Sequence, residues 1–332
     1  MPQHVVASPV GAIAATGASP PPAATPGPNN DMFMGIAAMV LFTIIAPGID
    51  VLAKIATQSI PPAEISIARF VAQLLALLPI VLWRGELKRL SPRILALHAL
   101  RGTAVATATI CFISALRVMP VADATAIFFV GPLFLTLLGG LVLGEPVGWR
   151  RYTACIVGFA GALLVIQPSF GTLGAAALLP VGAAMAFTIY VLPTRKLASS
   201  QTVFSMQAFA GLFGMAFVAI VLWLGEGTGS RVFDPVWPDR AGWALLATIG
   251  VLTTISHLFL VYAFSRANAS LLAPLQYLEI VAATGFGYMA FGNLPDLIKT
   301  AGIAVIVGSG VYIIWRERVV ARRAQAARRR AR

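Results

Sequence analysis

The sequence predicts an all-α integral membrane protein with ten transmembrane helices, arranged as two inverted repeats of five helices each. Three features predict this fold: an apolar composition, a succession of apolar segments, and a weak similarity between the two halves. Of the 332 residues, 58% are hydrophobic and 11% are charged. A water-soluble chain of this length cannot bury so much apolar surface, so the lipid bilayer must be its solvent.

Ten apolar segments follow one another along the chain. Each has about 20 residues, which is the length that crosses a hydrocarbon core as a helix. The predicted spans are Phe33–Ala56, Ala63–Trp83, Ile94–Leu116, Val121–Leu143, Trp149–Ile166, Ala175–Pro193, Val203–Leu224, Ala241–Ala263, Ala269–Phe291 and Leu297–Ile314.

The chain divides into four regions. Residues 1–30 are rich in Pro, Ala, Gly and Ser and contain no Lys or Arg, which predicts a disordered cytoplasmic leader rather than a signal peptide. The two repeats cover residues 33–168 and 173–316, with a polar, glycine-containing linker expected around Ser169–Gly174. Residues 317–332 are expected to form a basic cytoplasmic tail.

The two halves are weakly similar to each other. Residues 113–168 align with residues 261–317, with Ala115 on Ala263 and Gly144 on Gly292. Such internal repeats are typical of transporters. Because each half holds five spans, an odd number, the second half enters the membrane from the opposite side and the repeats are inverted.

This alignment predicts where a cargo would bind. Inverted-repeat carriers bind their cargo near the midplane of the membrane, where the halves meet. The alignment places Phe128 on Gln276 and Gly131 on Glu279. We therefore expect spans four and nine to face each other, with Phe128 and Gly131 opposite Gln276 and Glu279.

The basic residues are distributed unequally between the two sides of the membrane. The net charge is +12, and eight of the 24 Lys and Arg residues lie within Arg316–Arg332. The loops after even-numbered spans and this tail hold seventeen of them, against four in the opposite loops. This asymmetry predicts the inner (cytoplasmic) membrane, with both termini in the cytoplasm. The tail is expected to contact anionic phospholipid, so nucleic acid is not needed to explain it.

Several short motifs resemble a known family. They open span two, close span four, and recur in spans five and nine: Ala63–Arg69 (AEISIAR), Leu141–Arg150 (LVLGEPVGWR), Gly158–Gly161 (GFAG) and Ala273–Glu279 (APLQYLE). Together they are similar to the drug/metabolite transporter superfamily, in its ten-helix EamA type. The segments 273–280 and 293–296 also resemble a subgroup that contains bacterial S-adenosylmethionine uptake carriers. The resemblance implies a carrier, since the family includes riboflavin importers and amino-acid exporters.

One departure from the repeat pattern concerns an acidic residue. The first half has Gly144-Glu145-Pro146 after span four, whereas the second half has Gly292-Asn293-Leu294-Pro295 after span nine. A role of the Glu145 carboxylate is therefore not duplicated.

Ionisable residues inside the spans are the candidate site, because a charge in the bilayer usually faces a wet cavity or a partner. Glu279 lies near mid-membrane, with Gln276 and Tyr277 beside it; it either binds substrate or pins helix packing. Asp50 and Lys54 are four residues apart, next to the kink expected at Pro47. They either neutralise each other or line the outer entrance.

The remaining candidates also have two interpretations each. Arg69 pairs with Asp50 or holds an anionic cargo. Arg101 either faces inward or extends to the cytoplasmic interface. Phe128 stacks on a flat cargo or only packs, and His257 is a satisfied buried histidine or a proton relay.

The sequence favours a secondary transporter of a small organic metabolite. The cargo is expected to be S-adenosylmethionine-like or riboflavin-like for uptake, or an amino acid for export. The alternative is a membrane-embedded enzyme, but the chain lacks H-E-x-x-H, G-x-S-x-G and a phosphate-binding glycine loop. We therefore expect no catalysis, no metal and no cofactor.

Overall fold

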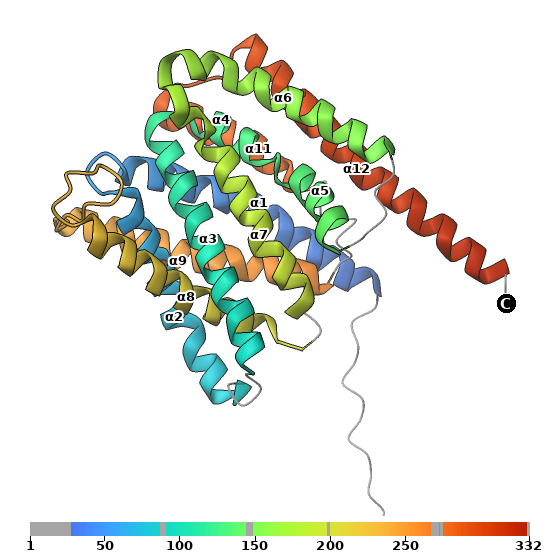
Figure 1. The fold of residues 1–332 in the computed structure, drawn as a ribbon, viewed down its shortest axis with the longest axis horizontal. Coiled ribbons are helices and arrows are strands. Elements are labelled where there is room, and N and C mark those ends of the chain that lie inside the picture. The colour runs from blue at the N-terminus through green and yellow to red at the C-terminus, as the bar shows by residue number, and fades with distance from the viewer. Residues whose placement is uncertain are drawn as a thin grey trace, which may run out of the picture.

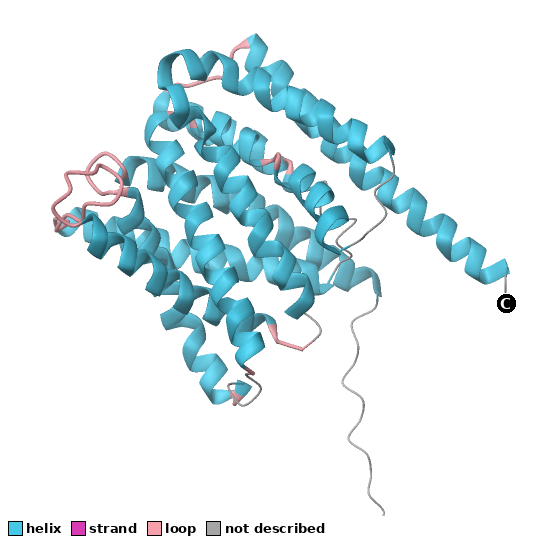
Figure 2. Cartoon of the chain, in the orientation of Figure 1, coloured by secondary structure: helices cyan, strands magenta, loops and turns pink. Residues whose placement is uncertain are grey.

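The computed structural model describes residues 28–86, 91–143, 149–197, 200–266, 272 and 275–330, and within these ranges it is helical without strands (Figure 2). Six described helices are long and apolar enough to cross a membrane. Four shorter apolar helices accompany them: Val121–Leu135, Tyr152–Ile166, Leu278–Phe291 and Leu297–Ile313. Together these helices account for the ten predicted spans.

The helices are labelled in Figure 1. Their bounds are α1 Pro28–Ala56, α2 Pro62–Trp83, α3 Pro92–Val118, α4 Val121–Phe128, α5 Gly131–Leu143, α6 Trp149–Leu173, α7 Leu179–Leu197, α8 Val203–Gly225, α9 Arg240–Arg266, α11 Leu278–Phe291 and α12 Leu297–Arg330. Helices α4 and α5 together form span four, and α11 forms most of span nine.

The packing of the helices follows the two repeats. Helix α2 packs against α8, and α6 against α12; each pair joins helices that hold the same place in the two halves. Helix α3, the third span of the first half, packs against α7, the first span of the second half. The equivalent pair with the two halves exchanged is α9 against α1. Figure 1 shows α6 and α12 lying side by side along one edge of the bundle. The predicted pair of inverted five-helix repeats is confirmed.

Glycines allow two of these helix pairs to approach closely. A Cβ atom added to Gly161 in α6 would lie 2.9 Å from the carbonyl oxygen of Gly302 in α12. A Cβ added to Gly250 in α9 would lie 2.7 Å from the Cβ of Ala72 in α2. Such contacts stabilise helix pairs in lipid, where the hydrophobic effect between helices is absent.

The secondary structure of the connection between the repeats differs from the predicted linker. The linker expected around Ser169–Gly174 is helical up to Leu173, because α6 continues to that residue. Gly174 ends this run with a φ of 57°, a left-handed conformation that glycine adopts without steric cost. A 3-10 helix, Gly174–Leu178, follows, so α7 begins at Leu179 rather than at Ala175.

Three predictions concern regions at the edge of the described residues. Residues 1–27 of the predicted leader lie outside them, and so do residues 144–148, where the sequence predicts the turn that contains Glu145. Residues 317–330 of the basic segment continue the last span, since α12 is helical to Arg330.

The end of the bundle that carries the α1–α2 connection, residues 57–61, is here called the first-loop end. The long 226–239 segment lies beside this connection (Figure 1). The amide of Ala63 donates to the carbonyl of Val232 at 3.1 Å, and the amide of Val236 donates to Oε2 of Glu64 at 3.1 Å. This segment is therefore fastened to the start of α2.

Candidate functional site

The breaks in spans four and nine meet inside the bundle. Span four is interrupted by a turn at Phe129 and Val130, and α11 begins directly after a turn at Tyr277. The internal alignment pairs Phe129 with Tyr277, and their ring centroids are 5.1 Å apart. Non-helical backbone within a membrane persists only where protein or a cavity surrounds it. The meeting of two breaks therefore marks the centre of the molecule.

Tyr277 is held by packing. Its side chain is 7% exposed, and its hydroxyl has no hydrogen-bond partner among the described residues. A Cβ added to Gly310 in α12 would lie 1.5 Å from this hydroxyl oxygen, so the absence of a side chain at Gly310 makes room for the ring. This geometry gives Tyr277 a role in helix packing.

Phe128 faces a different part of the bundle from the one expected. Its ring lies 5.3 Å from the ring of Phe112 in α3 and 5.5 Å from that of Phe187 in α7. The adjacent residue, Phe129, makes the contact with span nine, through Tyr277. Phe187 in turn lies 5.4 Å from Tyr190, so a row of aromatic rings extends along α7.

Four ionisable residues from four helices are coupled electrostatically within the bundle. Asp50 in α1 interacts with Arg69 in α2 and with Glu279 in α11. Arg69 also interacts with His257 in α9. Asp50 is 8% exposed, whereas Glu279 and Arg69 are half-buried. The structure thus brings together three of the predicted site residues, and we call Asp50, Arg69, His257 and Glu279 the central cluster.

His257 differs from a satisfied core histidine. Its Nδ1 atom is buried and has no hydrogen-bond partner among the described residues. A crevice of about 10 Å³ adjoins it, which is room for about one water molecule. The crevice is lined by Gln73, Leu77, Val203, Phe204, Gln207, Thr254, His257 and Leu258. Gln276, the other predicted polar residue of span nine, is half-buried.

Arg101 is turned into the protein rather than toward the membrane surface. It is 1% exposed, and its Nε donates to Oγ1 of Thr194 in α7 at 2.7 Å. Its Nη1 donates to the carbonyl of Met206 in α8 at 2.9 Å, and its guanidinium lies 4.9 Å from the ring centroid of Tyr190. These contacts fasten α3 of the first half to α7 and α8 of the second. The interfacial interpretation of Arg101 is wrong, because buried acceptors on the other half satisfy its donors.

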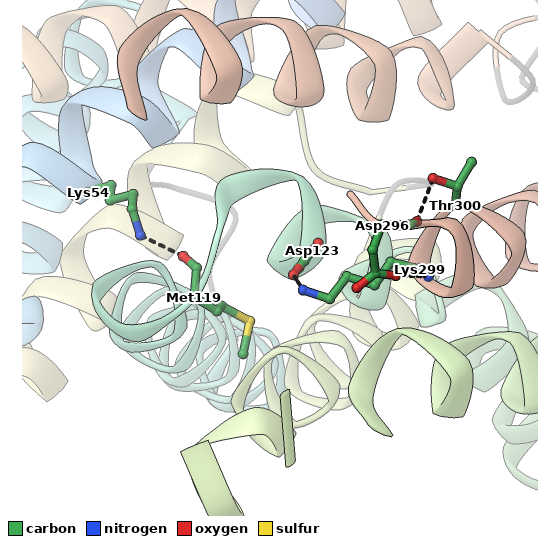
Figure 3. A network of polar contacts seen from close by, with 6 residues as sticks. All are labelled: Lys54, Met119, Asp123, Asp296, Lys299 and Thr300. Carbon is green, nitrogen blue, oxygen red and sulfur yellow. Dashed lines mark hydrogen bonds and ion pairs between the residues drawn. The ribbon is translucent and has the colours of Figure 1, made fainter. Parts of the chain in front are cut away.

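Lys54 does not pair with Asp50, although the two residues are one helical turn apart. Its Nζ donates to the carbonyl of Leu116 at 2.7 Å and to that of Met119 at 2.6 Å. Figure 3 shows the second of these hydrogen bonds. These carbonyls belong to the C-terminal end of α3, where the helix dipole favours a cation. The ring of Phe291 lies 5.4 Å from the same ammonium group. Lys54 therefore joins α1 to α3 at the first-loop end.

Asp123 and Lys299 form an ion pair that the sequence analysis missed. Oδ2 of Asp123, in the first turn of α4, accepts from Nζ of Lys299, in the first turn of α12, at 2.6 Å (Figure 3). Asp123 is 1% exposed, and Lys54 contributes a further attraction. The sequence contains one signal for this ion pair, which is the carboxylate at position 123 in an otherwise apolar span. The sequence does not indicate its partner, because Lys299 is 176 residues away.

Comparisons with known proteins agree with this architecture. A model of the EamA-like transporter family matches residues 33–167 and 174–316. A solved crystal structure covers 88% of this chain and 99% of its own, with a TM-score of 0.57 and 21% identity. At that level of identity the likeness concerns the fold.

Three similar proteins carry names that state a cargo. The S-adenosylmethionine uptake transporter of Rickettsia felis is 28% identical over 288 residues, which is 86% of this chain and 93% of that protein. The riboflavin transporter of Brucella anthropi is 28% identical, over 77% of this chain and 88% of its own. The pseudopaline exporter CntI of Pseudomonas aeruginosa is 27% identical, over 82% and 93% respectively. Two matched repeats, broken spans that meet at the centre and relatives named as transporters agree: the chain belongs to the EamA-like transporter family.

Proposed function

We propose that this transporter carries a small organic metabolite with a cationic group, and that the central cluster and the adjoining helix breaks form its binding site. The observation that supports this proposal is the position of Glu279 in the first turn after the break of span nine, within electrostatic reach of Asp50. Broken helices of membrane carriers expose their backbone and side chains to cargo near the midplane. Two carboxylates at that point favour a positively charged group.

The charge of the cluster distinguishes among the cargoes named for the relatives. S-adenosylmethionine carries a sulfonium cation and an amino-acid group, whereas riboflavin is uncharged at neutral pH. The carboxylates of Asp50 and Glu279 outnumber the Arg69 guanidinium, and this excess favours the sulfonium compound. The half-buried ring of Phe128, with Phe187 beside it, offers a stacking surface for a flat base. We therefore infer an S-adenosylmethionine-like cargo.

The site residues have different roles in this proposal. Glu279 and Asp50 attract the cationic group, and Gln276 hydrogen-bonds a polar edge of the cargo. Arg69 offsets part of the negative charge of Asp50. Lys54, Arg101 and Tyr277 support the site through helix packing, since each is occupied by contacts within the protein.

Transport assays in liposomes test the cargo and the site together. Purified protein in proteoliposomes is expected to accumulate labelled S-adenosylmethionine faster than labelled riboflavin. Glu279→Gln is expected to lower this rate about tenfold or more, since a lost charge-assisted contact of about 1.5–3 kcal/mol corresponds to that factor. Gln276→Leu is expected to lower it several-fold, since a neutral hydrogen bond contributes about 0.5–1.5 kcal/mol.

Two exposed positions provide matched controls. Glu226→Gln and Gln58→Leu make the same chemical changes away from the bundle centre, and both are expected to keep the wild-type rate. Wild-type rates for both Glu279→Gln and Gln276→Leu, at equal membrane levels, would place the cargo site elsewhere.

We also propose the location and orientation that the charge asymmetry favours: the inner membrane, with both termini in the cytoplasm. The first-loop end then faces away from the cytoplasm. The basic C-terminal part of α12 emerges on the cytoplasmic side, where each basic residue contributes about 1 kcal/mol of attraction to anionic phospholipid.

A further inference from the structure

A groove on the outside of the bundle lies between α6 and α12. Its volume is about 440 Å³, and residues of both helices line it: Trp149, Thr153 and Val157 of α6, and Gly308, Ser309 and Tyr312 of α12. Trp149, Thr153 and Val157 are exposed, so the groove opens toward the surrounding membrane. Sites for small organic molecules have volumes of about 300–1,000 Å³, and this groove falls within that range.

Small side chains at the base keep the groove open. Ala154 and Ser309 are buried there. A Cβ atom added to Gly308 would meet no atom within 4 Å, whereas one added to Gly158, in the neighbouring helix contact, would lie 2.5 Å from Oγ of Ser309. The helices therefore pack closely at Gly158 and leave free space at Gly308.

The two helices run in opposite directions. Gly158 of α6 lies against Ser309 of α12, whereas Gly161 lies against Gly302. The first turn of α6 therefore lies beside the part of α12 that follows Ser309. Figure 1 shows α12 continuing past the beginning of α6. The groove thus leads toward one surface of the membrane.

Aromatic residues border this end of the groove. Trp149 and Tyr312 line it, and the ring centroid of Trp315 lies 5.8 Å from that of Tyr312. All three side chains are exposed. Trp and Tyr are enriched where the hydrocarbon core of a membrane meets the headgroups, so the groove extends from the core to the headgroup level.

Basic residues follow at the same end. Residues 149–151 and 315–318 contain four arginines and one glutamate. Arg150 precedes Thr153 by three residues, and Arg316 follows Tyr312 by four, so each shares a helix face with a residue that lines the groove. A groove that ends at positive charge is complementary to an anionic phospholipid, which has apolar chains and a negatively charged headgroup. Basic pockets between transmembrane helices bind such headgroups.

A second copy of the chain suits this face less well. The positive-inside rule gives all copies the same orientation, so a copy packed on α6 and α12 would bring its own arginines to the same end. Like charges repel, whereas an anionic lipid offsets the excess of positive charge.

We propose that this groove binds one anionic phospholipid, with an acyl chain along Val157, Gly308 and Tyr312 and the phosphate near positions 150 and 316. The site differs from the general attraction of the basic tail to the membrane, because it requires the groove as well as the charge. Helices α6 and α12 are the fifth spans of their repeats, so the lipid joins the two halves. Its leaflet rests on the proposed orientation, whereas the lipid site depends on neither orientation nor cargo.

Native mass spectrometry of the full chain in a neutral detergent tests the site. Titration with dioleoyl phosphatidylglycerol is expected to leave one lipid bound, at concentrations where dioleoyl phosphatidylcholine leaves none. Because the lipid binds the folded chain, phosphatidylglycerol is also expected to raise the thermal unfolding midpoint by a few degrees, whereas phosphatidylcholine is expected to leave it unchanged.

Filling the groove is expected to remove both effects. Gly308→Leu places a side chain in the open space that the lipid would occupy. The matched control is Gly285→Leu in α11, because Gly285 is also exposed and a Cβ added there also meets no atom within 4 Å. The control is expected to keep the bound lipid and the thermal shift.

A second pair of variants fills the groove from its other wall. Thr153→Phe changes an exposed threonine of α6, whose Oγ1 donates to the carbonyl four residues earlier at 2.8 Å. Thr248 in α9 is exposed and makes the same hydrogen bond at 2.8 Å, so Thr248→Phe is the control. Only Thr153→Phe is expected to lose the lipid, and this pair decides the test if Gly308→Leu does not fold.

Charge variants separate the groove from the membrane surface. Arg316→Gln is expected to weaken phosphatidylglycerol binding about fivefold, the factor that corresponds to about 1 kcal/mol per basic residue. Removal of residues 322–332 takes away basic residues beyond the groove and is expected to keep the bound lipid.

Three outcomes would contradict the site. Loss of lipid on removal of residues 322–332, with lipid retained in Gly308→Leu and Thr153→Phe, would overturn the groove site in favour of surface attraction. Equal binding of phosphatidylcholine would overturn the choice of an anionic lipid. A dimer that Gly308→Leu dissociates would assign this face to a second copy of the chain.

Discussion

Tyr277 and Gly310 illustrate how single residues hold the centre of this carrier together. Tyr277 ends the break of span nine, its ring packs at a tilt against that of Phe129 in span four, and its hydroxyl fills the space above Gly310. The hydroxyl is buried without a partner among the described residues. The contact therefore depends on shape, and an added methyl group at position 310 must displace the ring.

Gly310→Ala is expected to destabilise the protein by about 1–3 kcal/mol, the usual range for overpacking. Thermal unfolding of detergent-solubilised protein measures this change. Gly308→Ala, on the same helix with no atom within 4 Å of the added Cβ, is expected to be neutral. Adding Tyr277→Phe to Gly310→Ala removes the 1.5 Å contact but leaves Cζ at 2.6 Å, so it should recover only part of the loss. Equal stability of the two alanine variants would contradict this packing.

At the scale of the elements, polar contacts join the first turns and last turns of helices at the first-loop end. Lys54 of α1 binds the end of α3, Asp123 of α4 binds Lys299 of α12, and Arg117 of α3 donates to the carbonyl of Arg231 in the 226–239 segment. Helices from both repeats are thereby fixed to one another at this end. Because Asp123 is buried, its ion pair has the largest consequence when broken.

Lys299→Met is expected to destabilise the protein by about 3–5 kcal/mol, because it leaves the Asp123 carboxylate buried without its partner. The double variant Asp123→Asn, Lys299→Met is expected to recover most of that loss, and the same unfolding assay measures both. Glu86→Gln breaks the pair with Arg84, whose side chain is 47% exposed, and should change stability by about 1 kcal/mol or less. A double variant no more stable than Lys299→Met alone would show that the pair is not what stabilises this end.

For the whole molecule, the inverted repeat has a direct topological consequence. The equivalent pairs α3 with α7 and α9 with α1 exist because the second half is turned over relative to the first. An odd number of spans in each half places the inter-repeat connection on the side opposite to both chain ends.

Reporters fused after Gly171 and after the C-terminus are expected to lie on opposite sides of the membrane. With the proposed orientation, an alkaline phosphatase fusion at Gly171 should be active and one at the C-terminus inactive, and green fluorescent protein fusions should show the reverse. Activity of the same reporter at both positions would exclude the inverted arrangement.

Apolar segment lengths determined the number of spans, and the helices of the structure follow them closely because a helix that crosses lipid must satisfy its backbone internally. The sequence similarity between the halves was enough to predict the inverted repeats and to pair span four with span nine. The apolar spans around them also identified Asp50, Arg69 and Glu279 as charges that need a partner.

Tertiary structure alone decided which partner each charge has. Helical spacing put Asp50 and Lys54 on one face, but it could not foresee that Lys54 would reach the carbonyls of α3. Arg101 could have reached the membrane surface along its own helix; the acceptors that hold it inside belong to α7 and α8. A buried charge is satisfied by groups that are close in space, and most of those groups lie in other helices, many residues away in the chain.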